Sequence, residues 1–63
     1  MFRFKRQTPG GPIYVMMLGN SVSRTQMTPK GNIDVGLTDT LNAEEMDRCI
    51  QEHRDDPEWL EVY

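Results

Sequence analysis

Residues 42–54, NAEEMDRCIQEHR, carry the pattern that decides the fold of this chain. Asn42 and Glu45 have the spacing of a capping box, in which each side chain accepts a hydrogen bond from the other residue's backbone. Four further side chains recur at spacings of three, four and seven, which places them on one helical face: Met46, Cys49, Ile50 and His53. The pattern predicts a helix over about 42–54 that buries this face against a sheet.

The segment after the helix predicts a short final strand. Pro57 disfavours helical backbone angles at the residue before it, so the helix is expected to end there. The closing EWLEVY then alternates with the period of two that is typical of a strand. We expect Leu60 and Val62 to face the helix. Trp59 and Tyr63 are then expected to emerge on the opposite face of the sheet.

The first third of the chain predicts two strands. FRFKR, residues 2–6, alternates apolar and basic side chains, which places Phe2 and Phe4 on one face. Two prolines and two glycines within residues 7–12 then break the strand. IYVMML, residues 13–18, is apolar on both faces and rich in strand formers, so it predicts a central strand that is covered, at least in part, on both sides.

Residues 22–37 predict a β-hairpin that extends the sheet. Pro29 and Gly31 mark a tight turn between two strand-like segments. In the second segment, IDVGL, the alternation is expected to point three apolar side chains inward: Ile33, Val35 and Leu37. Residues 1–63 therefore predict one small α+β domain, in which a mostly antiparallel sheet of four or five strands packs against one helix.

The chain carries ten acidic side chains and seven Lys or Arg, for a net charge of -3, but the two signs are separated along the sequence. Residues 1–33 hold five basic residues and no acidic one, whereas residues 34–63 hold all ten acids. A basic sheet surface with aromatic side chains can bind nucleic acid. An isoelectric point near 4.9 opposes contact with phosphates, so we favour a protein partner over nucleic acid.

The sequence predicts no catalytic, cofactor or metal site. Its single cysteine cannot form an internal disulfide. Cys49 and His53 lie one helical turn apart, the spacing at which two side chains can coordinate one zinc ion. Two ligands do not complete a zinc site. We interpret both as part of the helix face that packs on the sheet. The glycines match no phosphate-binding motif, and a non-enzymatic protein is expected.

Six residues are candidates for a protein interface. An acidic cluster lies beside the helix end and consists of Asp55, Asp56 and Glu58. It either marks a solvent-exposed helix end and turn or binds basic side chains of a partner. Trp59 and Tyr63 either pack within the domain or anchor a partner, because aromatic side chains dominate interface energies. We expect both near a tyrosine of the central strand. The candidates are therefore Tyr14, Asp55, Asp56, Glu58, Trp59 and Tyr63.

TDTLNAEEMDRCIQEH at residues 38–53, followed by EWLEV at residues 58–62, resembles the C-terminal halves of small uncharacterised proteins encoded by tailed bacteriophages. Such proteins combine a few short strands, an acidic turn that opens one helix, a histidine near the helix end and a final aromatic and acidic strand. The resemblance implies a virion accessory protein or another phage-encoded binding protein. It implies no catalytic residues.

Together these features predict a non-enzymatic protein–protein interaction module. The expected version is a phage structural protein, such as a capsid decoration or connector-type subunit, that binds a larger protein or assembles with copies of itself. The alternative is a small phage- or bacterium-encoded inhibitor that occupies a host enzyme's site with its acidic helix and tail. IYVMML is too short for a membrane span or a signal peptide, so we expect a protein of the host cytoplasm or of the virion.

Overall fold

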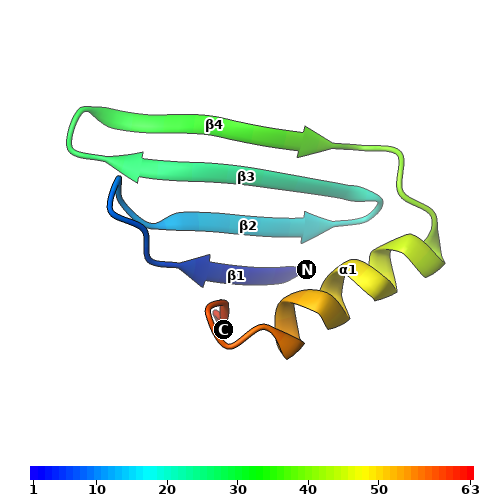
Figure 1. Ribbon diagram of the computed structural model, residues 1–63. Coiled ribbons are helices and arrows are strands. Elements are labelled where there is room, and N and C mark those ends of the chain that lie inside the picture. The colour runs from blue at the N-terminus through cyan, green and yellow to red at the C-terminus, as the bar shows by residue number, and fades with distance from the viewer.

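The computed structural model describes residues 1–63 as one five-stranded antiparallel sheet and one helix (Figure 1). In chain order the elements are β1 (Phe2–Arg6), β2 (Ile13–Leu18), β3 (Ser21–Thr28), β4 (Gly31–Thr38), α1 (Ala43–Asp55) and β5 (Leu60–Glu61). The strands lie in the order β4-β3-β2-β1-β5, so the short last strand pairs with the first. The predicted small α+β fold is confirmed.

The helix α1 begins and ends at the predicted signals. The Asn42 side chain accepts a hydrogen bond from the Glu45 backbone N–H at 2.8 Å. The Glu45 carboxylate accepts one from the Asn42 N–H at 3.1 Å, which completes the capping box. After the helix, Asp56 is extended, with φ -88° and ψ 116°, as expected of the residue before Pro57. Local sequence therefore fixes both ends of α1.

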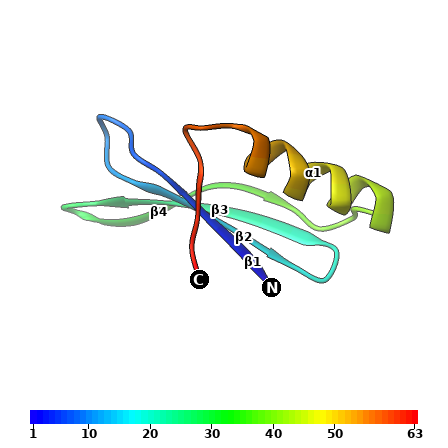
Figure 2. The same cartoon turned by 90° about the horizontal axis from the view of Figure 1, so that it is seen from below.

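The core lies between α1 and one face of the sheet. Four strand side chains are fully buried there: Phe4, Val15, Met17 and Val22. They meet three buried side chains of the helix: Met46, Ile50 and His53. The predicted helix face is confirmed, with Cys49 partly buried at its margin. The core is thin, since only seven of the 63 residues are buried and α1 covers a single face (Figure 2).

The strand β2 is central, as predicted, but it is covered on one side only. Val15 and Met17 point into the core. Met16 and Leu18, which alternate with them, are 42% and 58% exposed. The prediction of cover on both sides is wrong, because α1 is the one element outside the sheet and it lies against the other face (Figure 2).

The β3–β4 hairpin is confirmed, but the predicted inward face of β4 is wrong. Ile33 pairs with Gln26. Leu37 pairs with Ser23, and Val35 is an extra residue where the register shifts between the two pairings. Because side chains alternate along β3, the two partners lie on opposite faces, and so do Ile33 and Leu37. None of the three apolar side chains is buried, since this edge strand is exposed along most of its length.

The strand β5 has the opposite phase to the one predicted. Glu61 pairs with Phe4, whose side chain is in the core, so Glu61 lies on the helix side and Leu60 faces away. Trp59 also lies on the helix side, with its ring centroid 4.9 Å from that of His53. The predicted faces of Leu60 and Trp59 are therefore wrong. The indole packs beside the end of α1, while the Glu61 carboxylate bonds an arginine of that helix.

Candidate functional site: the open face of the sheet

The side of the sheet that faces away from α1 is uncovered, and we call this surface the open face (Figure 2). Strand register fixes which side chains lie on it, because directly paired residues in an antiparallel sheet share a face. The open face carries Arg3 and Lys5 of β1, Tyr14, Met16 and Leu18 of β2, Ser21, Ser23, Thr25 and Met27 of β3, Asn32, Asp34 and Leu37 of β4, and Leu60 of β5.

The register arranges these side chains in rows that run across the strands. One row spans all five strands and consists of Asp34, Thr25, Tyr14, Lys5 and Leu60. The neighbouring row spans four strands and consists of Leu37, Ser23, Met16 and Arg3. The open face is also sorted by side-chain size along most of its length, since β2 contributes three large side chains and β3 three small hydroxyl side chains, followed by Met27 near the end of β3. Bulky groups along β2 therefore stand beside a strip of small ones.

Exposed apolar side chains gather on this face. Leu37 and Leu60 are 69% and 67% exposed, and they join the exposed Met16, Leu18 and Met27. The Lys5 ammonium lies 5.7 Å from the centroid of the ring of its row neighbour on β2, which is a cation–π distance. A patch of exposed apolar side chains with charged groups at its margin is typical of a protein-binding surface.

Charge differs between the two sides of the molecule. The open face holds two bases and one acid, which are Arg3, Lys5 and Asp34. Exposed acids concentrate instead on α1 and on the turn after it: Glu44, Glu45, Asp47, Glu52, Asp55 and Glu58. The basic and acidic halves of the sequence therefore stay partly separate in space. The outer surface of the helix is strongly acidic, whereas the open face is apolar with a basic margin.

The predicted interface residues do not form one cluster. Tyr14 lies on the open face, in the middle of the five-strand row. Trp59 lies on the helix side, so the expected patch of Trp59 and Tyr14 on one face is not formed. Tyr63, at the end of the chain, is 97% exposed.

The residues of the predicted acidic cluster after α1 form hydrogen bonds and an ion pair with nearby residues of the same chain. The Asp55 carboxylate accepts a hydrogen bond from the Gln51 amide at 2.8 Å. The Asp56 carboxylate accepts one from the Glu58 backbone N–H at 2.9 Å, which closes the turn that leads to β5. The Glu58 carboxylate pairs with Arg6 of β1 at 2.6 Å. Exposed ion pairs contribute little to stability, so this pair orients the turn more than it stabilises the fold.

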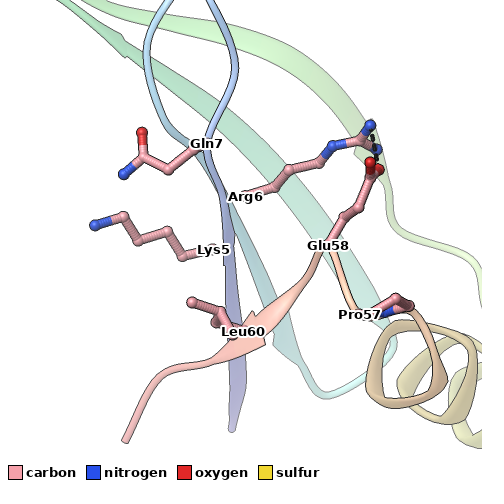
Figure 3. Close-up of a pocket in the computed structure, with 6 residues that line it drawn as sticks. All are labelled: Lys5, Arg6, Gln7, Pro57, Glu58 and Leu60. Atoms are coloured by element: carbon pink, nitrogen blue, oxygen red, sulfur yellow. Dashed lines mark ion pairs between the residues drawn. The ribbon is translucent and has the colours of Figure 1, made fainter.

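A shallow pocket of about 360 Å³ lies where β5 separates from β1 (Figure 3). It is lined by Lys5, Arg6, Gln7, Pro57, Glu58 and Leu60. Figure 3 shows the Arg6–Glu58 ion pair on one side of β1 and the Lys5 side chain on the other. Four of the six lining residues are polar or charged, whereas small-molecule sites are lined mainly by hydrophobic and aromatic side chains. The pocket therefore has little of the character of a small-molecule site.

Cys49 and His53 lie together on α1, as their spacing predicts. The Cys49 sulfur is 3.9 Å from His53 Nδ1, and the same Nδ1 is 2.8 Å from the Cys49 carbonyl oxygen. Because a carbonyl can only accept, Nδ1 carries a proton and donates it there, so this nitrogen is not a base for the thiol. Burial raises the pKa of the Cys49 thiol, which keeps it protonated at neutral pH. No group of three or more His, Cys, Asp or Glu is placed to hold a metal ion.

No protein-family model matches this chain, and no curated protein or solved structure resembles it significantly. The helix α1 lacks the length and the apolar run that a membrane crossing requires. The resemblance to small phage proteins stays a prediction. Function is therefore argued from the geometry and chemistry of the open face.

The candidate interface residues chosen from the sequence do not include the five apolar side chains that are exposed on the open face: Met16, Leu18, Met27, Leu37 and Leu60. A signal for the first two was present, because IYVMML is apolar on both faces and the chain has one helix to cover it. One side of this strand had to remain exposed or meet a partner. Leu37 and Leu60 carried no such signal, since their faces depend on the bulge in β4 and on the phase of β5.

Proposed function

We propose that this chain is a non-enzymatic protein–protein interaction module whose open face binds a protein surface. The supporting observation is that five exposed apolar side chains lie on the same uncovered face of one sheet: Met16, Leu18, Met27, Leu37 and Leu60. Removing apolar surface from water contributes about 25 cal/mol per Å². Covering this face therefore provides a favourable free energy for association.

The thin core supports the same proposal. A domain of about 60 residues buries only about 60% of the surface of its unfolded chain, and its stability is correspondingly marginal. Here the central strand β2 buries Val15 and Met17 and leaves its other side exposed. A partner on the open face completes a third layer around β2, which is a common architecture for a sheet with two apolar faces.

A finer proposal is that the module is a structural subunit of a phage particle, of the capsid decoration or connector type. It is supported by the resemblance of residues 38–53 and 58–62 to small phage proteins and by the uncovered apolar face of the five-stranded sheet, which can dock on a larger assembly. A subunit of this kind is present in purified particles in stoichiometric amount. Mass spectrometry of such particles tests this directly. If the protein is absent from the particles, the finer proposal is contradicted.

A second candidate function is favoured by the acidic surface of α1. Six exposed acids lie on the helix and the turn after it: Glu44, Glu45, Asp47, Glu52, Asp55 and Glu58. Such a surface complements a basic substrate-binding site and steers association electrostatically. It is the surface that an inhibitor of a host enzyme would use. The two candidates therefore predict opposite sides of the molecule as the binding surface.

Capture of partners from the source cells by immobilised chain separates the two functions. Met16→Glu places a charge in the open face, and Glu52→Lys reverses a charge on the acidic helix surface. We expect Met16→Glu to lose the partners that wild type retains, and Glu52→Lys to keep them. The opposite pattern contradicts the proposal and favours the inhibitor. Far-UV circular dichroism of each variant shows whether the fold is retained.

A further inference from the structure

We infer that the open face binds a second copy of this chain, face to face, about a two-fold axis that runs parallel to the strands between β2 and β3. This inference rests on the proposed function and names its partner. Sheets that pack face to face lie about 10 Å apart with their strands nearly aligned. In this arrangement β2 of each copy lies over β3 of the other, and β1 of each lies over β4 of the other.

Side-chain size favours this pairing. The axis places Tyr14 of one copy over Thr25 of the other, because both lie in the five-strand row. It likewise places Met16 over Ser23, which share the neighbouring row. In these two rows large side chains thus meet small ones, which is the complementarity that close packing between two sheets requires. The two-fold axis repeats each contact, so one arrangement satisfies both copies.

Charge favours it as well. Lys5 and Asp34 occupy the same row but lie on β1 and β4, the two strands that the axis brings together. Each lysine therefore lies over the aspartate of the other copy, and the pair occurs twice. In the neighbouring row Arg3 lies over Leu37, where its aliphatic stem covers the exposed leucine while its guanidinium reaches water. A second copy therefore places a complementary side chain opposite both Lys5 and Arg3.

The dimensions of the molecule suit such a dimer. The chain measures 35 by 24 Å in its two longest directions, with a depth of 17 Å. A standard stable interface buries roughly 800 Å² on each partner, and the two longest extents of the whole chain enclose about that area, which is the upper limit for the open face. The acidic helices lie on the outer sides of the two sheets, so their repulsion across the dimer is small. Two-fold dimers are also the commonest form of protein oligomer.

Sedimentation equilibrium of three charge variants and one control variant tests the pairing. Lys5→Glu and Asp34→Lys each place like charges opposite one another, and each is expected to raise the dimer dissociation constant about tenfold or more. The double variant restores both pairs with the signs exchanged, and its dissociation constant is expected to return close to the wild-type value. Lys30→Glu makes the same charge change in the exposed β3–β4 turn and is expected to leave dimerisation unchanged.

Two results overturn the inference. One is a wild-type chain that keeps its single-chain mass of 7.3 kDa throughout the millimolar range. The other is a double variant that dimerises no better than the single variants. The capture experiment with Met16→Glu separates this inference from the proposed function. If the wild-type chain is monomeric but captures a different protein, and Met16→Glu abolishes that capture, only the inference of a second copy is contradicted. If Met16→Glu captures the same partners as wild type, the proposed function itself is contradicted.

Discussion

Trp59 and His53 pack ring against ring on the helix side of the sheet, with their centroids 4.9 Å apart. The His53 ring also lies 5.2 Å from the ring of Phe4, at the base of the core. Aromatic rings at these distances attract one another beyond simple area burial. The indole therefore connects the last segment of the chain to both α1 and β1, which makes it a structural residue.

Trp59→Ala is expected to lower the free energy of unfolding by about 2 kcal/mol, less than for a fully buried aromatic because the indole is only partly buried. Tyr63→Ala, at a side chain that is 97% exposed, is the matched control and is expected to have almost no effect. Chemical denaturation of both variants measures the difference. Equal stability of the two variants would mean that the contact with His53 contributes nothing.

Asn42→Ala is expected to cost about 1 kcal/mol of stability, because it leaves a backbone donor at the start of α1 without its partner. Asn32→Ala, at an exposed position of β4, removes the same side chain without removing a cap. Thermal unfolding of the two variants measures the contribution of the capping box. The same melting temperature for both would contradict the helix start at this asparagine.

The helix could be predicted from the sequence because its determinants are local. Asn42 and Glu45 lie within one turn, and the apolar stripe that ends at His53 has the helical period. The phases of β4 and β5 are not local. One extra residue, Val35, moves Leu37 to the open face, and nothing in IDVGL marks it. The phase of β5 follows from the pairing of Glu61 with β1. The open face could therefore be predicted only for β2.

The stability of the fold is expected to fall at alkaline pH because of Cys49. Burial raises the pKa of its thiol above the ordinary value of 9.0. Two charges make smaller contributions: Arg24 lowers this pKa and Glu52 raises it. Above that value the unfolded chain loses the proton while the folded chain retains it. The stabilisation is therefore complete below about pH 9 and is lost as pH rises through the folded pKa.

Urea unfolding at about pH 7.5 and about pH 10 measures this loss. Cys49→Ala removes the thiol, and its stability is expected to change less between the two pH values than that of wild type. All other ionisable side chains are the same in both proteins, so the difference between the proteins isolates the cysteine. An identical change in both would show that the Cys49 thiol ionises equally in the folded and unfolded chains.

The central claim is that the open face, and no other apolar part of the surface, is where this chain associates. Met16 and Ile33 test it most directly, because they are 42% and 52% exposed and lie on opposite sides of the sheet. The measurement is the mass of wild type, Met16→Glu and Ile33→Glu by sedimentation equilibrium at the same concentration. We expect wild type and Ile33→Glu to have twice the single-chain mass and Met16→Glu to be a folded monomer. Dissociation by Ile33→Glu with a persistent Met16→Glu dimer would contradict the account, and so would a monomeric wild type.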